Sequence, residues 1–339
     1  MPGWNKLRLG QIGCGAFGES HLATLAGIPF VEVVAVTDVV EDRARTLAVR
    51  YGVPRVTKDF QELCALQELD AVSVVTTEDQ HVEPVLAALR KGKHVFVEKP
   101  MATRMSDAQK MADAAQKAGC ILMPGHVLRF ETKYAAVKEN IAAGSLGRIV
   151  SIYARRNRPK REGAIYNRTH LSFETSIHDI DAMLWYVESG VTRVRGYNRR
   201  IAVKSGDDFF CGVVEFENGA VGILQTSWLL PDKTAALDDS MQVIGSAGVA
   251  NIDVLHAGLT IWSEDGQSAP DVSYEPRLRA SVFGALREEL SYFAQCALEG
   301  RQPTVVTAQD GAEAVRIAVA LTDSAGSDRE IAVSSAASA

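Results

Sequence analysis

Short apolar runs alternate with amphipathic stretches along the first third of the chain. The runs are rich in valine and isoleucine, which favours buried strands, and the stretches between them have helical composition. The expected strands are Leu7–Ile12, Val31–Asp38, Ala71–Thr76, His94–Glu98 and Cys120–Pro124. The expected helices are Gly18–Ala26, Glu41–Tyr51, a helix capped by Asp59 that runs to about Cys64, Val82–Lys91, and Met105–Ala118 with Gly119 as its C-cap. This alternation predicts an α/β fold with a doubly wound parallel sheet, covered on both faces.

The rhythm changes after about residue 125. We expect a polar loop over Asn157–His170 and a helix over Ser176–Val187. The expected strands are Arg148–Arg155, Arg193–Asn198, Asp208–Phe216, Ala220–Trp228, Met241–Ile244, Val249–Val254 and Leu259–Trp262, with a tight hairpin at Asn218–Gly219. The last expected helices are Val282–Leu298 and Ala308–Asp323, the second capped by Thr307. This part predicts an α+β domain with a mostly antiparallel sheet.

Length and composition limit the kinds of protein that the chain represents. At 339 residues, two domains are expected: residues 1–124 and residues 125–333, followed by a flexible tail over residues 334–339. A net charge of -6 argues against nucleic acid and membrane surfaces as partners. Five scattered cysteines, no apolar N-terminal leader and no membrane-length apolar run indicate a reduced, cytoplasmic protein.

A glycine pattern joins the first expected strand to the first helix. Gly13, Cys14, Gly15, Ala16, Phe17 and Gly18 form G-x-G-x-x-G. In a Rossmann domain the first glycine permits a tight turn, the second admits a pyrophosphate, and the third lets helix and strand pack closely. The alternative is a plain structural loop. The strand–turn–helix–strand context favours the dinucleotide site.

Asp38 closes the second expected strand, where a carboxylate accepts hydrogen bonds from the adenosine ribose. The following Val39 and Val40 supply no arginine for a 2′-phosphate, so NAD is expected rather than NADP. The alternative is that Asp38 only caps the next turn.

Lys99 follows the strand His94–Glu98, at the end where doubly wound sheets bind ligands. A lysine there is suited to hold a substrate hydroxyl and, if its pKa is lowered, to exchange a proton. Pro100 would lock the turn, with a cis bond as one option. An exposed loop lysine is the alternative.

The segment from Glu174 to Asp181 contains a second candidate group. If it is helical, Glu174 and His178 lie one turn apart, with Asp181 on the same side. A carboxylate beside imidazole supports a general base. Two ligands are fewer than catalytic zinc usually takes from protein, so no metal is expected. A buried histidine satisfied by a helix carboxylate is the simplest alternative.

These motifs together resemble the glucose-fructose oxidoreductase, inositol dehydrogenase and rhizopine catabolism (Gfo/Idh/MocA) family. The resemblance rests on Gly13–Gly18 with Asp38, Glu98-Lys99-Pro100, Gly125-His126-Val-Leu-Arg129-Phe130, Gly144-x-Leu-Gly147-Arg148-Ile and Glu174–Asp181. It implies an N-terminal Rossmann domain, a C-terminal domain with a large open sheet, and a homodimer or homotetramer. It also implies that Lys99 and His178 are the catalytic lysine and histidine.

The chain departs from the family pattern at two places. Glu174 stands where aspartate is common four residues before the histidine, so it is expected to orient His178 or reach the substrate. Thr76-Thr77-Glu78 replaces Thr-Pro-Asn ahead of the nicotinamide-side histidine, His81, and Glu78 adds a charge there. By this resemblance Thr76, Thr77, His81, Glu98 and Lys99 contact the cofactor.

Further polar residues are candidates for substrate contacts. His126, Arg129, Arg156 and Asn157 are expected to bind hydroxyls or a carboxylate, with surface or salt-bridge roles equally open. Tyr166, Asn167 and His170 belong to a polar loop that would cover the site, and Trp228 either walls it or packs the sheet. We assign His21, His94 and His256 to structural roles.

The motifs predict NAD-dependent hydride transfer from a hydroxyl-bearing carbon of a sugar, cyclitol or sugar acid. Lys99, His178 and Glu174 would act on that substrate. Two alternatives stay open: a sugar–sugar oxidoreductase in which tightly held NAD cycles, and a non-catalytic NAD-responsive binding protein.

Overall fold

A computed structural model describes residues 6–166, 168–233, 237–254, 259, 261–263, 266–268, 271–278 and 281–333. The chain forms two compact units. The first contains Met1–Phe130 and Tyr274–Ala312, and the second contains Glu131–Ser273 and Glu313–Ala339. In the described part of the chain, no helix is long and apolar enough to cross a membrane.

The first unit is built on a six-stranded sheet in which every neighbouring pair is parallel. The strand order is β3-β2-β1-β4-β5-β6. The strands are β1 (Leu7–Ile12), β2 (Val31–Thr37), β3 (Arg55–Val56), β4 (Ala71–Val74), β5 (His94–Val97) and β6 (Leu122–Pro124). Their carboxyl ends therefore share one edge, which is where the sequence motifs of the first third are found. The doubly wound parallel sheet is confirmed.

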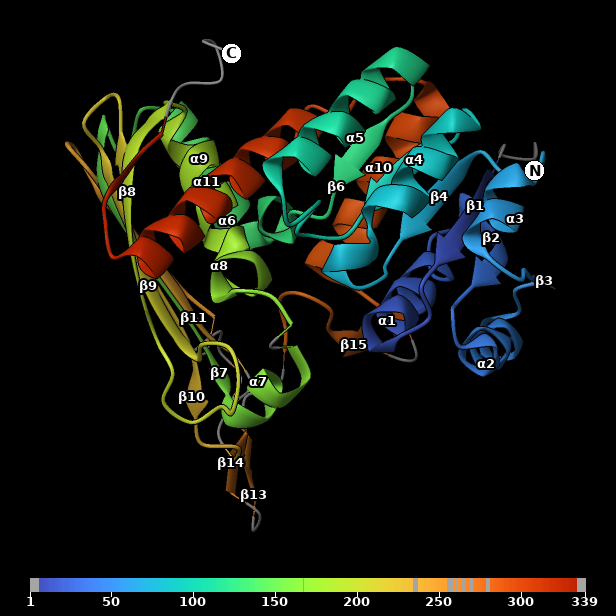
Figure 1. The fold of residues 1–339 in the computed structure, drawn as a ribbon, viewed down its shortest axis with the longest axis horizontal. Coiled ribbons are helices and arrows are strands. Elements are labelled where there is room, and N and C mark those ends of the chain that lie inside the picture. The colour runs from blue at the N-terminus through green and yellow to red at the C-terminus, as the bar shows by residue number, and fades with distance from the viewer. Residues whose placement is uncertain are drawn as a thin grey trace. The chain divides into compact units, whose positions relative to one another are not determined.

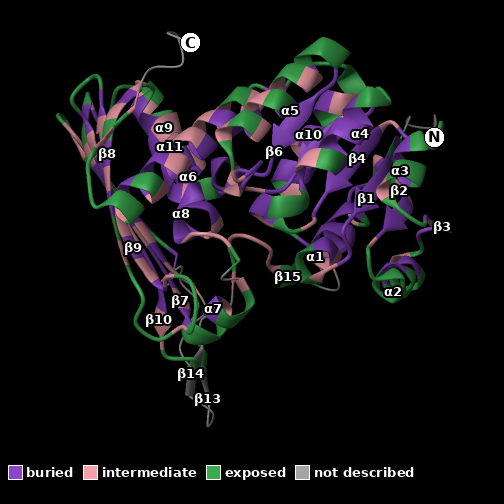
Figure 2. Cartoon of the chain, viewed as in Figure 1, coloured by how far each residue is buried: buried purple, intermediate pink, exposed green. Residues whose placement is uncertain are grey.

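Helices cover both faces of this sheet (Figures 1 and 2). They are α1 (Ala16–Leu25), α2 (Glu41–Tyr51), α3 (Phe60–Ala65), α4 (Val82–Arg90), α5 (Met105–Ala118) and α10 (Ala285–Glu299), with short 3₁₀ turns η1 (Glu78–Gln80) and η2 (Val127–Phe130). α1, α2 and α10 pack on one face, and α3, α4 and α5 lie together on the other. Two expected caps are confirmed: Asp59 accepts from the amide of Glu62 (2.8 Å), and Gly119 adopts φ +63° at the end of α5.

The chain returns to the first unit after residue 273, which differs from the single boundary expected at residue 124. Leu286, Leu290 and Phe293 of α10 are at most 2% exposed and pack in one cluster with Leu7 and Phe96 of the sheet. The chain returns because α10 carries an apolar stripe that is buried in the core of the first unit. A short hairpin, β15 (Arg277–Leu278) and β16 (Ser281–Val282), precedes α10.

The second unit is built on a seven-stranded sheet in the order β12-β11-β7-β10-β9-β8-β17. The strands are β7 (Ile149–Pro159), β8 (Val191–Arg199), β9 (Phe209–Phe216), β10 (Val221–Leu230), β11 (Asp238–Gly245), β12 (Val249–Asp253) and β17 (Ile331–Ala332). Only β7 and β10 pair in parallel within this described sheet, so the mostly antiparallel prediction is confirmed. Gly219 adopts φ +85° in the expected hairpin between β9 and β10.

Helices lie on one face of the seven-stranded sheet (Figure 1). They are α6 (Thr132–Ala142), α7 (Lys160–Tyr166), α8 (Leu171–Glu174), α9 (Ile177–Val187) and the second half of α11 (Ala308–Ser327). Thr307 caps α11 as expected, because its Oγ1 accepts from the amide of Asp310 (3.1 Å).

The polar loop expected over Asn157–His170 is wrong for most of its length. β7 continues to Pro159, and α7 follows directly. Helix α7 packs on Trp228, which is 1% exposed, and a Cβ on Gly163 would lie only 3.2 Å from the indole Cε3. Tertiary packing at this glycine stabilises a helix that local composition does not favour.

Some expectations fall outside the described residues. These are Asn167, His256 and the tail over residues 334–339. The strand expected over Leu259–Trp262 is described only in part, as β13 (Ile261–Ser263), which pairs with β14 (Gly266–Ser268).

Candidate functional site

The three glycines of the first turn meet three different environments. A Cβ on Gly13 would lie 2.2 Å from the carbonyl oxygen of Val75, and its φ is +102°. A Cβ on Gly18 would lie 2.4 Å from the carbonyl oxygen of Gly13. At Gly15 a Cβ would meet no atom within 4 Å. The first and third positions therefore require glycine for the fold, whereas the second opens onto free space beside the backbone.

The side chain of Gln11 on β1 stabilises this turn, a role that was not predicted from the sequence. Its Nε2 donates to the carbonyl oxygens of Gly13 (2.9 Å) and Gly18 (2.8 Å), and the side chain is fully buried. The signal was present, because Gln11 is the one polar residue with an uncharged side chain in the strand Leu7–Ile12. A buried side-chain amide nitrogen needs acceptors, and the carbonyls of the following turn supply two for Nε2 of Gln11.

Asp38 joins the end of β2 to the glycine turn. Its Oδ2 accepts from the amide of Cys14 (2.7 Å), and its Oδ1 accepts from the amide of Val40 (2.8 Å). The capping role named as an alternative is therefore present. A carboxylate oxygen accepts more than one hydrogen bond, so this role is compatible with a ribose contact. Val39 is fully exposed beside it.

The glycine turn fits a dinucleotide. Gly15 is the N-cap of α1 and provides no side-chain cap, so the first amides of α1 remain available to a ligand's phosphates. Ala16 and Phe17 in this first turn are exposed. A pyrophosphate would occupy the free space beside Gly15, with the positive end of the helix dipole behind it.

The chain after β4 carries the residues expected near the nicotinamide. Thr76 is partly buried, Thr77 is exposed, and Glu78 is only 4% exposed. His81 is buried, with Nδ1 2.9 Å from the carbonyl oxygen of Pro100 and Nε2 3.3 Å from that of Thr76. Burial lowers the pKa of His81, against the effect of these two carbonyls, which raise it. His81 therefore ties the β4 loop to the loop after β5.

Lys99 lies two residues after the end of β5, and it is partly buried. The Lys99–Pro100 peptide bond is cis, the option considered from the sequence. The preceding Glu98 is 6% exposed: its Oε1 lies 3.0 Å from Nε2 of His21 on α1, and its Oε2 accepts from the amide of Lys99 (3.1 Å). Glu98 thus connects the lysine to the helix that begins at the glycine turn.

His126 and Arg129 are both buried in the first unit. The Arg129 guanidinium donates to the carbonyl oxygen of Val305 (2.8 Å) and pairs with Asp310 (3.3 Å). Although burial raises the pKa of Asp310, Arg129 and hydrogen bonds from Thr307 hold it below its usual value. These contacts favour the salt-bridge alternative for Arg129.

The Glu174–Asp181 segment in the second unit is not one helix. Glu174 ends α8, Thr175 and Ser176 follow, and His178 lies in the first turn of α9. His178 and Asp181 are one turn apart on α9, and both Glu174 and His178 are partly buried. Oε1 of Glu174 lies 3.8 Å from Nη2 of Arg168. Among the residues that the structure describes, no group of three or more His, Cys, Asp or Glu side chains is arranged to hold a metal ion.

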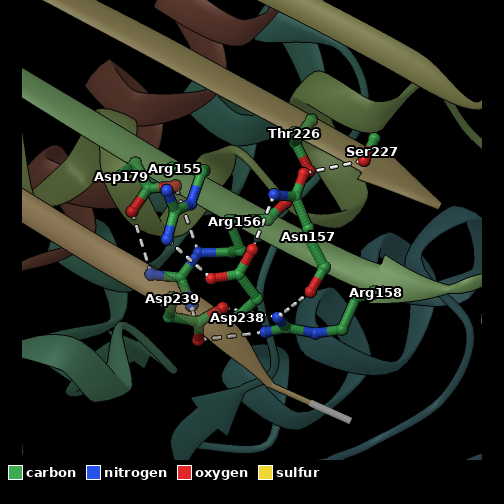
Figure 3. Close-up of polar contacts among 9 residues, drawn as sticks. All are labelled: Arg155, Arg156, Asn157, Arg158, Asp179, Thr226, Ser227, Asp238 and Asp239. Atoms are coloured by element: carbon green, nitrogen blue, oxygen red, sulfur yellow. Dashed lines mark hydrogen bonds and ion pairs between the residues drawn. The ribbon is translucent and has the colours of Figure 1, made fainter. Parts of the chain in front are cut away.

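Arg156 and Asn157 lie within a buried polar network at the ends of β7, β10 and β11 (Figure 3). Arg156 pairs with Asp179 (2.9 Å) and Asp239 (2.5 Å), and all three side chains are at most 2% exposed. Asn157 accepts from Ser227 (2.7 Å) and donates to Asp238 (2.9 Å). Burial raises the pKa of Asp179, and the Arg156 guanidinium opposes this. The internal ion-pair alternative is favoured for Arg156.

The remaining polar candidates have structural contacts. His170 caps α8 by accepting from the amide of Ser172 (3.1 Å), and burial lowers its pKa. Nδ1 of His94 accepts from the amide of Ile121 (3.1 Å). Trp228 packs the sheet against α7.

Comparison with known proteins identifies both halves of the chain. Residues 7–126 match "Oxidoreductase family, NAD-binding Rossmann fold", and residues 134–251 match "GFO/IDH/MocA C-terminal domain". The chain is 28% identical over 329 residues to scyllo-inositol 2-dehydrogenase (NAD(+)) of Bacillus subtilis (strain 168), and the alignment covers 94% of this chain and 94% of the relative. It is 29% identical over 335 residues to myo-inositol 2-dehydrogenase of Thermotoga maritima, which covers 96% of this chain and 98% of the relative.

Solved structures share the whole fold. A probable dehydrogenase from Thermotoga maritima superposes with a TM-score of 0.80 at 26% identity, over 96% of this chain and 98% of that one. Apo scyllo-inositol dehydrogenase from Lactobacillus casei superposes with a TM-score of 0.85 at 22% identity, over 98% of this chain and 99% of that one. The second likeness concerns the fold alone.

Proposed function

Because this chain belongs to the GFO/IDH/MocA family of NAD-binding oxidoreductases, we propose that it is a cyclitol or sugar dehydrogenase that oxidises a secondary hydroxyl. Relatives that match over nearly the full length are named inositol 2-dehydrogenases, which supports an inositol as the first substrate to test. Bound NAD would supply the hydride acceptor for this reaction.

The residues that hold NAD are those of the first unit's carboxyl edge. Gly13 and Gly18 shape the turn, Gly15 would admit the pyrophosphate, and Asp38 would accept hydrogen bonds from the ribose hydroxyls. Thr76, Thr77 and the loop tied by His81 border the nicotinamide side. The carboxylate at Asp38 disfavours a 2′-phosphate at that position, which supports NAD over NADP.

The observation that carries the proposal is the place of Lys99. β1, β4 and β5 are parallel neighbours, so Lys99 at the end of β5 shares one sheet edge with the glycine turn at the end of β1. Its ammonium group would donate a hydrogen bond to the substrate hydroxyl oxygen and stabilise negative charge as the proton leaves.

We assign the base to His178 of the second unit. Its imidazole would take the hydroxyl proton while hydride leaves the same carbon. Glu174 would accept a hydrogen bond from this imidazole or from the substrate. This assignment requires Lys99 and His178 to act on the same substrate molecule.

A neutral polyol suits these residues better than a sugar acid. The two arginines considered for carboxylate binding, Arg129 and Arg156, each pair with carboxylates of the protein itself. Their positive charge is therefore already balanced, and neither offers a strong reason to select an anionic substrate.

The test is NADH formation with myo-inositol, scyllo-inositol and neutral hexoses, together with separate measurement of NADH binding. Lys99→Met and His178→Asn should each lower kcat by about 10² to 10⁴ fold while NADH affinity changes little. Lys91→Met is the matched control, because Lys91 is an exposed lysine of the same unit. Wild-type turnover in Lys99→Met would remove Lys99 from the reaction.

Assays on the same preparation distinguish a dehydrogenase that exchanges its NAD from an oxidoreductase that retains and recycles it. A purified protein that already absorbs as a nucleotide complex and transfers hydride between two sugars without added NAD would support recycling. Dependence of turnover on added NAD supports the dehydrogenase.

We also propose that the chain forms a homodimer or homotetramer through the seven-stranded sheet. Tyr153 of β7 and Ile223 of β10 are register partners on the face opposite the helices, 40% and 42% exposed. Val213 of β9 extends this apolar row. An apolar patch on a sheet face favours burial against a second copy. Light scattering should give a multiple of 36.6 kDa, and Ile223→Glu should lower it.

A further inference from the structure

The residue after His178 is part of the buried polar network (Figure 3). Asp179 accepts two hydrogen bonds from the Arg156 guanidinium: Oδ2 from Nε (3.1 Å) and Oδ1 from Nη2 (2.9 Å). Both side chains are 2% exposed. A two-point contact between planar groups sets orientation as well as distance.

Arg156 is in turn held by three strands of the sheet. It lies on β7 opposite Asp239 of β11, its register partner, whose Oδ2 accepts from Nη1 (2.5 Å). The carbonyl oxygen of Arg156 accepts from Oγ1 of Thr226 on β10 (2.7 Å). Arg158 also donates to Asp239. Through Arg156, Asp179 is therefore anchored to β7, β10 and β11.

Helix geometry transmits this anchor to His178. Consecutive residues of an α-helix are about 100° apart around its axis, so a fixed direction for Asp179 fixes the direction of its neighbour. Ser176, the N-cap of α9, makes no side-chain cap hydrogen bond. The Arg156 contact thus constrains the first turn of α9 where a capping side chain would otherwise do so.

We propose that Asp179, held by its two-point contact with Arg156, is the positioning residue for His178. The inference rests on the proposed function, in which His178 accepts the hydroxyl proton. The positive charges of Arg156 and Arg158 balance the negative charges of Asp179 and Asp239. The buried group can therefore orient α9 without leaving an unpaired charge. Displacement of a reacting group by about 1 Å can cost about 10²-fold in rate.

Asp179→Asn tests the proposal, with Asp239→Asn as the matched control. Both variants remove one carboxylate charge from Arg156, but only Asp179 lies on the helix that carries His178. The assay uses NAD and scyllo-inositol deuterated at every ring carbon, whose six carbons are equivalent. Asp179→Asn should lower kcat about 10²-fold, with a smaller change in KM and a larger deuterium isotope effect. Asp239→Asn leaves the two-point contact between Arg156 and Asp179 in place, so it should retain an isotope effect near the wild-type value.

Amide hydrogen exchange supplies a readout that needs no substrate. Asp179→Asn should accelerate exchange in residues 178–182 more than Asp239→Asn does. Arg156→Lys is the second variant if Asp179→Asn does not fold, because it keeps the charge and removes the planar two-point contact. It should raise the isotope effect and the exchange in the same segment.

Partial unfolding lowers the active fraction but leaves the isotope effect unchanged, so a loss of kcat with an unaltered isotope effect and unaltered α9 exchange would overturn the positioning role. Failure of the proposed function has a different signature. In that case His178→Asn would retain wild-type turnover, whatever Asp179→Asn does to exchange in α9.

Discussion

The carboxylate of Asp38 bonds to the backbone amide of Cys14, 2.7 Å away, between the end of β2 and the middle of the glycine turn. One side chain therefore shapes the turn and presents negative charge beside the expected ribose site. In the proposed NAD site, structure and cofactor choice are therefore coupled at Asp38, and a substitution there must separate the two effects.

Asp38→Asn should weaken NADH binding by about tenfold and improve NADPH binding. Asparagine keeps one acceptor, enough for the amide of Cys14 but not also for that of Val40, and a hydrogen bond to a charged group contributes about 1.5–3 kcal/mol, more than one to a neutral group. The loss of negative charge also removes repulsion of a 2′-phosphate. Fluorescence titration with both nucleotides measures the change. Asp42→Asn, an exposed acid in the first turn of α2, should leave both affinities unaltered.

Gly15→Ala should lower NADH affinity, whereas Gly18→Ala should lower the stability of the fold. At Gly15 the new methyl group meets open space, so the free energy of unfolding should stay within about 0.5 kcal/mol of wild type while NADH affinity falls about tenfold or more. At Gly18 the methyl group would lie 2.4 Å from the carbonyl oxygen of Gly13, which should cost about 1–3 kcal/mol of stability. Urea unfolding and NADH titration distinguish them. Normal NADH binding by Gly15→Ala would contradict the pyrophosphate position.

His170→Asn should reduce the loss of stability in mild acid. Burial lowers the pKa of His170 in the folded state, although the negative charge of Asp207 raises it. The unfolded chain therefore takes up a proton first, and this contribution to stability is complete above about pH 6.5 and is lost as the pH falls below it. Asparagine retains a cap acceptor for Ser172 without titrating. Urea unfolding at pH 7.5 and 5.5 should show a smaller difference in the variant; an unchanged difference would contradict this role.

Glucuronate should not be a better substrate than glucose, which differs from it only at the carboxylate-bearing carbon. An unneutralised arginine in the site would favour the acid by about 1.5–3 kcal/mol, or about tenfold or more in kcat/KM. Arg129 and Arg156 are already paired with Asp310, Asp179 and Asp239. A tenfold preference for glucuronate would show that another cation selects the substrate.

Local patterns predicted the elements whose signals are local. α5 spans Met105–Ala118 as expected, because Gly119 ends it in the left-handed conformation. α7 was missed, because its stability depends on Trp228, which is far away in the sequence. The return of α10 to the first core was missed for the same reason.

Site residues close together in the sequence were also easier to predict than those whose partners lie far away in it. The glycine turn and Asp38 form a compact motif, so their arrangement was predictable. For Arg156 the sequence left a substrate contact and a salt bridge equally open, because it does not show Asp179 and Asp239, which reach Arg156 from α9 and β11. Gln11 was overlooked because its partners are backbone carbonyls.

The route of the chain between the two units has a consequence for synthesis on the ribosome. Leu286, Leu290 and Phe293 complete the core around β1 and β5, yet they are made more than 150 residues after those strands. The nucleotide-binding sheet therefore emerges with one face still lacking α10, and that face stays uncovered while six strands of the seven-stranded sheet, β7 to β12, are translated. A nascent chain halted before residue 274 should expose this apolar face to chaperones, and release from them should follow translation of α10.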